Sequence, residues 1–154
     1  NDHADVCAAV KADGLHIGQE DLSPADARAV IGPDCILGQS VSNAAELKAV
    51  DVGLVDHIGI GPIYSTATKT DAGPQLGIEG FAKLASHKPC PVVAIGSVKA
   101  TMAAELFAAG ADGLAVVSAI CGQPDPGLAA KQLAQAVFAA KAAQAKLSSC
   151  SQIP

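Results

Sequence analysis

The sequence predicts an α/β protein in which parallel strands alternate with helices. Short apolar runs bounded by Gly, Asp or Pro recur along the chain, and longer stretches rich in Ala separate them. Such runs are typical of strands buried on both faces, and parallel strands need a crossover, usually a helix, between them. Half of the 154 residues are hydrophobic but only 3% are aromatic, so small apolar side chains must fill the core of one domain.

The individual elements follow from these runs and from local start signals. Ser23 stands before a proline at the first helical position, and Asn43 stands three residues before Glu46, so both are expected as helix N-caps. The expected strands are Gly14–Ile17, Cys35–Ser40, Val55–Ile60, Val92–Ile95 and Gly113–Val117. The expected helices are His3–Lys11, Pro24–Ile31, Ala44–Val50, Ile78–Ser86, Lys99–Ala109 and Pro126–Lys141, followed by a disordered tail over residues 142–154.

Two architectures are open for five parallel strands of this kind, a doubly wound sheet and a (β/α)8 TIM barrel. No helix begins with GxGxxG, or with GxxxxGK followed by Ser or Thr, so the nucleotide-binding doubly wound folds lack their best marker. In a barrel, functional residues follow the carboxyl ends of the strands. The unusual polar residues of this chain lie there, which favours the barrel.

Composition excludes several classes of function. The net charge of −5 argues against a general nucleic-acid binder, which needs clustered Lys and Arg. No apolar run approaches the length of a membrane span, and no secretion signal is visible, so we expect a cytoplasmic protein without a membrane partner. The five cysteines show no CxxC spacing and are interpreted as small buried hydrophobes in a reducing compartment.

Polar residues after the strands suggest one metal site and two anion sites. Asp2 and Asp21 suit a Mg²⁺ ion that takes its other ligands from substrate phosphates, although both could be solvated loop acids. The loop at 61–69 carries hydroxyls and an ammonium group that can surround an anion, and the turns containing Ser97 and Ser118 offer backbone N–H groups to a phosphate. Taken together, these sites favour phosphate chemistry. By contrast, the histidine at position 16 is interpreted as a hydrogen-bonded core residue.

Several segments resemble the thiamine-phosphate synthase family, in order, from residue 1 to about residue 141. They are Asn1–Asp2, GLHIGQED at 14–21, GIGPIYSTATK at 59–69, VAIG at 93–96, and GADG at 110–113 continuing to VVSAI at 116–120. The resemblance implies a (β/α)8 barrel that joins 4-amino-2-methyl-5-hydroxymethylpyrimidine pyrophosphate to a thiazole phosphate, with thiamine phosphate and pyrophosphate as products. It also implies Mg²⁺ as the cofactor and these two small molecules as the substrates.

The resemblance also implies roles for individual residues. Asp2 and Asp21 would hold Mg²⁺, Asn1 would contact the pyrimidine pyrophosphate, and Ser40 and Lys69 would be the catalytic residues beside the pyrimidine and the pyrophosphate. The thiazole-phosphate site would be lined by Thr66, Ala67, Thr68, Ser97, Val117 and Ser118. Ser97 departs from the family, which usually has Gly at this position.

By the family's plan, the five strands are the fourth to eighth of the barrel. Residues 1–141 would then be the C-terminal portion, with an N-terminal part outside this chain. Two other interpretations remain open: a truncated or degenerate relative that binds a phosphate ligand or pairs with another chain, and a thiazole tautomerase. A homo-oligomer is also left open.

Overall fold

The computed structural model describes residues 1–66 and 73–150, which form a five-stranded, wholly parallel sheet. The strands are β1 (Gly14–Ile17), β2 (Ile36–Val41), β3 (His57–Ile60), β4 (Val92–Ile95) and β5 (Gly113–Ala115). They pair in sequence order, so each strand lies between its neighbours in the chain. The predicted α/β class with parallel strands is confirmed.

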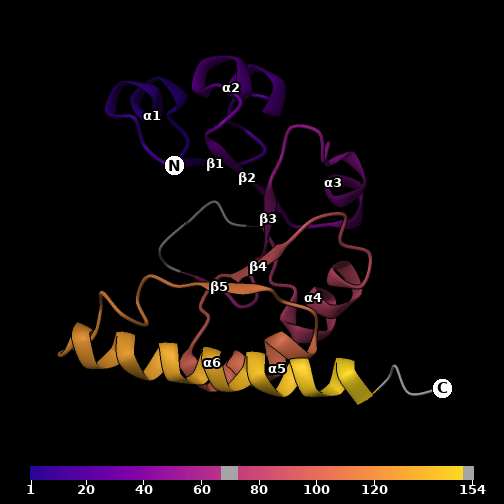
Figure 1. Ribbon diagram of the computed structural model, residues 1–154, viewed down its shortest axis with the longest axis vertical. Helices are drawn as coiled ribbons and strands as arrows, with labels where there is room; N and C mark the ends of the chain where they lie inside the picture. The colour runs from indigo at the N-terminus through magenta and orange to yellow at the C-terminus, as the bar shows by residue number, and fades with distance from the viewer. Residues whose placement is uncertain (67–72, 151–154) are drawn as a thin grey trace.

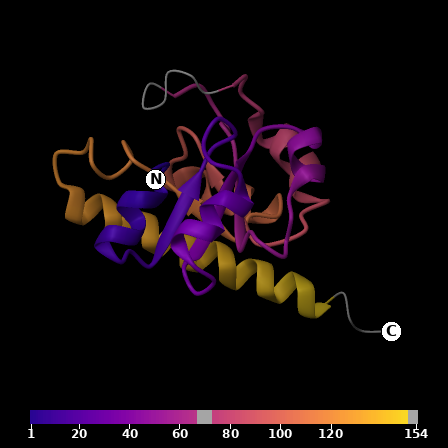
Figure 2. The same cartoon turned by 90° about the horizontal axis from the view of Figure 1, so that it is seen from above.

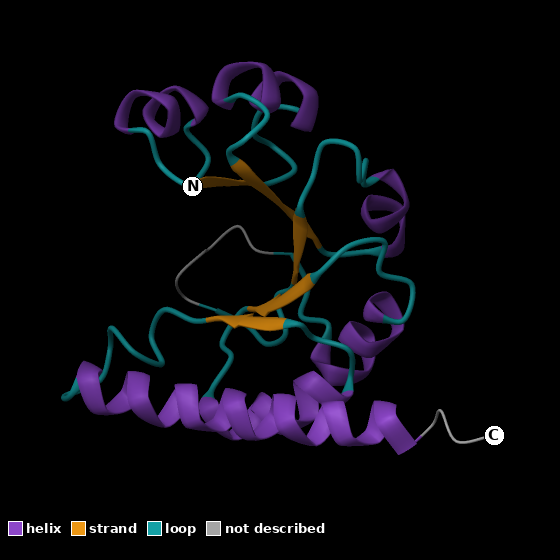
Figure 3. Ribbon diagram, viewed as in Figure 1, coloured by secondary structure: helices purple, strands orange, loops and turns teal. Residues whose placement is uncertain are grey.

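The helices lie on one side of this sheet. Figure 1 and Figure 3 show the strands arranged along an arc, with the helices on its convex side. The bounds are α1 (Ala4–Val10), α2 (Pro24–Ile31), α3 (Ala44–Ala49), α4 (Gly77–Ala85), a 3-10 turn η1 (Ala100–Met102), α5 (Ala103–Ala108) and α6 (Pro126–Cys150). Sequential parallel pairing with right-handed crossovers requires this one-sided arrangement.

The two faces of the sheet differ in composition because side chains alternate along each strand. The helix-covered face is largely apolar, since Leu37, Ile58 and Ile60 have no exposed surface, although the polar side chain of Gln39, the register partner of Ile58, also lies on it. The opposite, concave face carries His16, Gly38 and His57 at one level, since these residues are register partners across β1, β2 and β3. The concave face is therefore where polar side chains and bare backbone meet.

Both predicted N-caps are confirmed. The Ser23 side chain accepts a hydrogen bond from the backbone N–H of Asp26, and the Asn43 side chain accepts from the N–H groups of Ala45 and Glu46. Such caps satisfy N–H groups that the first turn of a helix leaves without partners.

The last helix corrects the expected disordered tail over residues 142–150, while positions 151–154 lie outside the described residues. α6 continues nine residues past Lys141, to Cys150, where the sequence suggested a frayed end. Its extension is rich in Ala, a strong helix former, and Gln144 Nε2 donates to the Phe107 carbonyl of α5 over 3.0 Å. In Figure 2 it is the long helix along one side of the molecule. No described helix is long and apolar enough to cross a membrane.

Two aspartates fasten the amino-terminal ends of neighbouring strands. Asp56 Oδ2 accepts from Leu37 N at 2.7 Å while Asp56 N donates to Leu37 O at 2.8 Å. Asp112 repeats this reciprocal pair with Val92, at 2.8 Å in both directions. Each carboxylate also forms an ion pair. Arg28 Nη2 lies 3.0 Å from Asp56 Oδ2, and Lys88 Nζ lies 2.7 Å from Asp112 Oδ2. We call each aspartate with its reciprocal pair of hydrogen bonds a clamp. β3 therefore begins at His57, two residues later than predicted, because Asp56 forms the clamp with Leu37.

The Asp56 clamp generates a pH-dependent prediction. The hydrogen bond from Leu37 N, assisted by the Arg28 guanidinium, lowers the pKa of Asp56. A lowered folded-state pKa contributes stability above the unfolded-state pKa and loses it as the pH falls through the folded-state value. We expect Asp56→Asn to reduce the free energy of unfolding by about 0.5–1 kcal/mol at neutral pH, since the side chain is partly solvated.

Urea unfolding at neutral and acidic pH measures this effect. The difference between wild type and Asp56→Asn should disappear in acid, where both side chains are uncharged. Asp34→Asn, which changes an exposed acid in the turn before β2, is the control and should behave like wild type at both pH values. An Asp56→Asn deficit of the same size at both pH values would contradict the electrostatic account.

Candidate active site

The carboxyl ends of all five strands lie along one edge of the sheet because every pairing is parallel. Most of the described predicted site residues follow these ends, and Ser40 is the penultimate residue of β2. They fall into two groups. We call Asp2, His16, Asp21 and Ser40 the β1–β2 group, and Ser65, Ser97 and Ser118 the β4–β5 group.

Backbone contacts bring the two predicted metal ligands to the same strand end. Asp2 N donates to the carbonyl of His16 near the end of β1, at 2.9 Å. Asp21 Oδ2 accepts from Gly18 N, directly after β1, at 2.6 Å. Asn1 directly precedes Asp2, and its carbonyl accepts from His3 N at 2.7 Å. Carboxylate oxygens are the kind of ligand that Mg²⁺ takes in proteins, and both of these aspartates stand at this strand end.

The described residues contain no group of three or more His, Cys, Asp or Glu side chains that could hold a metal ion. A magnesium ion at Asp2 and Asp21 would therefore depend on oxygen atoms from a substrate phosphate or from water for its remaining ligands.

Ser40 is tied to both sides of the β1–β2 group. Its Oγ lies 3.0 Å from His16 Nε2, and its carbonyl accepts from Gln19 Nε2 at 2.5 Å. The second contact holds the loop that carries Asp21 against the end of β2. The structure thus places the predicted catalytic serine and one predicted metal ligand on two segments that contact each other.

The position of His16 corrects the prediction that it lies in the core. It is hydrogen-bonded, as expected, but it lies on the concave face, whereas Leu15 and Ile17 point into the core. The ring of His57 lies 5.7 Å from that of His16. A Cβ atom on Gly38 would lie 2.4 Å from atoms of both rings, so the pair requires glycine there. Strand alternation was the signal that could have placed His16 correctly.

The β4–β5 group begins where the loop after β3 meets the end of β4. Ile63 N donates to the Ile95 carbonyl at 2.9 Å, and Tyr64 N donates to the Gly96 carbonyl at 3.2 Å. A Cβ atom on Gly96 would lie 2.6 Å from Pro62 Cα, and Gly96 has φ +98°. Gly96 is therefore required both for its backbone conformation and for the close approach of this loop.

Ser97 takes a left-handed conformation with φ +53°, which is unfavourable for a residue with a Cβ atom. Its Oγ donates to the Ser65 carbonyl at 2.6 Å. Ser65 in turn donates from N and from Oγ to Gln75 Oε1, each at 3.3 Å. Ser97, at a position where the family resemblance leads us to expect glycine, thus fastens the loop next to Thr66, the last described residue before position 73.

Ser97 and Ser118 line one pocket of about 430 Å³, so the two turns face the same space, and phosphate binding there stays a prediction. Lys99 and Thr101 also line this pocket, and they supply a cation and a hydroxyl that the sequence did not assign to it. Val117 is 52% exposed and lies beyond β5, which ends two residues earlier than predicted. The predicted residues Ala67, Thr68 and Lys69 lie outside the described residues.

Comparison with known proteins finds relatives of similar sequence. A family model described as thiamine monophosphate synthase matches residues 1–120. The thiamine-phosphate synthase of Azorhizobium caulinodans is 55% identical over 133 residues, 86% of this chain and 63% of that protein. That of Xanthobacter autotrophicus is 49% identical over 141 residues, 92% of this chain and 67% of that protein. The chain thus spans about two thirds of the length of these curated relatives.

Solved structures give the same picture. A thiamine phosphate pyrophosphorylase from Pyrococcus furiosus superposes with a TM-score of 0.80 at 35% identity, over 90% of this chain and 66% of that one. A 3-hexulose-6-phosphate synthase superposes with a TM-score of 0.66 at 17% identity, over 87% of this chain and 66% of that one. The second likeness concerns the fold alone.

Two substitutions at Ser97 distinguish how much its hydrogen bond and its left-handed backbone each contribute to the free energy of unfolding. Ser97→Ala removes the bond to Ser65 and keeps the unfavourable φ, whereas Ser97→Gly removes the bond and relieves the backbone. We expect the glycine variant to be more stable than the alanine variant by about 1 kcal/mol in urea unfolding. An alanine variant as stable as the glycine variant would show that the left-handed conformation carries no cost.

Proposed function

The chain belongs to the thiamine monophosphate synthase family, and from this premise we propose that the protein containing it is a thiamine-phosphate synthase. It would condense 4-amino-2-methyl-5-hydroxymethylpyrimidine pyrophosphate with a thiazole phosphate, releasing pyrophosphate and forming thiamine phosphate. The observation that carries the proposal is the 55% identity to a thiamine-phosphate synthase over 86% of the chain. The two groups of polar residues at one sheet edge support it, because the reaction has two phosphate-bearing substrates.

The β1–β2 group is proposed as the site of the pyrimidine pyrophosphate. Asp2 and Asp21 would hold Mg²⁺, which supplies positive charge to the pyrophosphate when bound. Asn1 would contact the same pyrophosphate. Ser40 would lie beside the pyrimidine or its pyrophosphate, and the contacts of Ser40 to His16 and Gln19 fix its position.

The β4–β5 group is proposed as the site of the thiazole phosphate. The pocket between Ser97 and Ser118 has the size and the donors for a phosphate, and Lys99 adds a cation at its edge. Val117, beside Ser118, would contact the thiazole. Thr66, Ala67 and Thr68 would complete this site, with Lys69 directed to the pyrophosphate; these roles rest on the family resemblance.

In this reaction the protein would act mainly by stabilising the charge of the transition state and by orienting the two substrates. As the bond between the pyrimidine and the pyrophosphate breaks, negative charge grows on the leaving group, and the thiazole nitrogen then attacks the pyrimidine. A cation held beside the leaving group is worth more in that transition state than in the ground state. Holding both substrates at one edge of a rigid sheet removes much of the entropic cost of bringing them together.

We further propose that the described sheet is a part, the last five βα units, of an eight-stranded barrel. The sequential order β1 to β5, the arc of the strands and the helices on the convex side support this arrangement. β1 and β5 each have one unpaired edge in the described sheet, and a barrel removes such edges. Closure needs further strands, from whichever polypeptide supplies them.

Asp21→Asn tests the metal-binding role. The amide keeps an acceptor for Gly18 N but removes the charge, so the loop is retained and the metal ligand is lost. In the full-length protein with both substrates, we expect pyrophosphate release to fall on the order of 10²-fold, with partial recovery at high Mg²⁺ concentration. Asp2→Asn should act in the same way, and Asp5→Asn, an exposed acid in the first turn of α1, should match wild type.

The same assay tests the function itself. Wild-type protein that binds both phosphates but forms no thiamine phosphate would be a binding relative, and one that only isomerises the thiazole phosphate would be a tautomerase. Unchanged turnover and unchanged Mg²⁺ dependence in Asp21→Asn would remove Asp21 from the metal site while leaving the synthase proposal intact.

Lys69→Ala separates transition-state stabilisation from substrate binding. Because charge develops on the departing pyrophosphate, we expect kcat to fall on the order of 10²-fold. Thr68→Val, at the thiazole-phosphate site, should instead raise KM for the thiazole phosphate with a smaller change in kcat. Steady-state kinetics with both substrates distinguishes these outcomes, and an unchanged kcat in Lys69→Ala would exclude Lys69 as a catalytic residue.

A further inference from the structure

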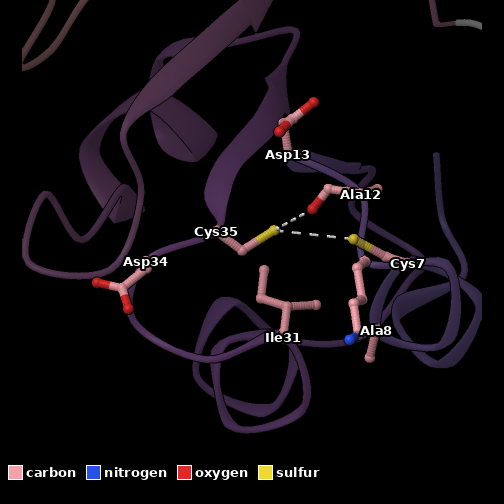
Figure 4. A pocket seen from close by; sticks show the side chains of 8 residues that line it. Cys7, Ala8, Ala12, Asp13, Ile31, Asp34 and Cys35 are labelled. Carbon is pink, nitrogen blue, oxygen red and sulfur yellow. Dashed lines mark hydrogen bonds between the residues drawn. The ribbon is translucent and has the colours of Figure 1, made fainter.

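Two cysteine side chains face each other at the end of the sheet opposite the candidate active site. Cys7 lies in α1, and Cys35 lies directly before β2. Their sulfur atoms are 3.8 Å apart although 28 positions separate them in the chain. Figure 4 shows both sulfur atoms pointing toward one another between the two segments.

The surroundings of the pair give it one accessible and one protected thiol. Cys7 is buried, and its Sγ lies 3.6 Å from the carbonyl of Gly14. Cys35 is half-buried, and its Sγ lies 3.6 Å from the carbonyl of Ala12. Cys7 and Cys35 both line a pocket of about 390 Å³, and Cys35 is only half-buried, so a small polar molecule can reach Cys35 from solvent.

We propose that Cys7 and Cys35 form a reversible intramolecular disulfide when the protein is exposed to a peroxide. A disulfide brings two sulfur atoms to about 2 Å. The observed separation is short enough that rotations of the two side chains, with small adjustments of α1, can close the gap. Among the cysteines whose side chains the structure describes, no other pair has its sulfur atoms in contact.

The reaction balances with hydrogen peroxide as the oxidant. The Cys35 thiolate attacks one peroxide oxygen, the O–O bond breaks, and Cys35 becomes a sulfenic acid while hydroxide leaves. Cys7, after losing its proton, then attacks the Cys35 sulfur; the S–S bond forms, the S–O bond breaks, and a second hydroxide leaves. With the two thiol protons these give two molecules of water. Both sulfur atoms are oxidised, and the peroxide is reduced.

The electrostatic environment sets the pH range of this reaction. Burial, and then the hydrogen bond and charge of Cys7, raise the pKa of Cys35. Asp13 acts in the same direction, and the Arg28 guanidinium opposes it. Lys11 and Asp34 also line the adjoining pocket. Because the thiolate is the nucleophile, oxidation should be slow at neutral pH and faster as the pH rises.

A disulfide here would have a defined structural effect. It would join α1 to the start of β2 and enclose β1 and α2 in one covalent loop. Cross-linking across such a loop restricts the unfolded chain and stabilises the fold. The bond would form away from the strand ends that carry Asp2, Asp21 and Ser40, so the proposal is independent of the proposed enzymatic function.

Peroxide treatment of the full-length protein tests the proposal. After oxidation, remaining thiols are alkylated in denaturant and the protein is digested without reductant. We expect a peptide pair joined through Cys7 and Cys35, two fewer alkylated thiols per chain, and a higher Tm. Reductant should reverse all three changes, and the rate of thiol loss should increase with pH.

Matched variants make the result specific. Cys7→Ser and Cys35→Ser should lose the linked peptide and the rise in Tm, whereas Cys121→Ser, which changes an exposed cysteine, should retain both. The proposal is overturned if Cys35 ends as a sulfinic acid with Cys7 still a thiol, if the linked peptides involve another cysteine, or if no thiol is lost. The peptide map of the wild-type protein decides this even if a serine variant does not fold.

Discussion

Parallel pairing of neighbouring strands is the constraint on which the rest of this structure depends. Each connection must return the chain to the same end of the sheet, and a helix does so while covering one face. The covered face then becomes the apolar core, with Leu37, Ile58 and Ile60 fully buried. The concave face carries glycines and histidines. The carboxyl ends of all five strands lie along one edge of the sheet. The location of the polar groups therefore follows from the pairing.

Much of the fold was predictable because its signals are local. The caps at Ser23 and Asn43 need only the residues that follow them, and the apolar runs locate the strands to within one or two residues. Errors occurred where tertiary contacts override local preference. Asp56 leaves the strand pattern to bind the neighbouring strand, and α6 continues past Lys141, where it contacts α5 through Gln144.

The candidate site was predictable only in part. Positions at strand ends and family motifs predicted Asp2, Asp21 and Ser40 as site residues, and parallel topology explains why they lie at one edge. The contacts that hold them join residues far apart in the chain, such as Gln19 with Ser40 and Ser97 with Ser65. No spacing rule encodes such contacts. His16 was misplaced because its apolar neighbours were read as one buried run rather than as an alternating strand.

The aspartate clamps have a consequence for how this sequence can vary. They lie at the amino-terminal ends of the strands, roughly 10 Å from the carboxyl ends, given about 3.3 Å per strand residue. Each carboxylate accepts from a backbone N–H of the neighbouring strand, so an exchange to a residue without a side-chain acceptor leaves that N–H group without its partner. Exchanges in the loops at the other end leave the sheet register untouched. Apart from positions such as Gly96, whose backbone conformation requires glycine, substitutions in those loops can therefore alter specificity without removing a hydrogen bond between strands.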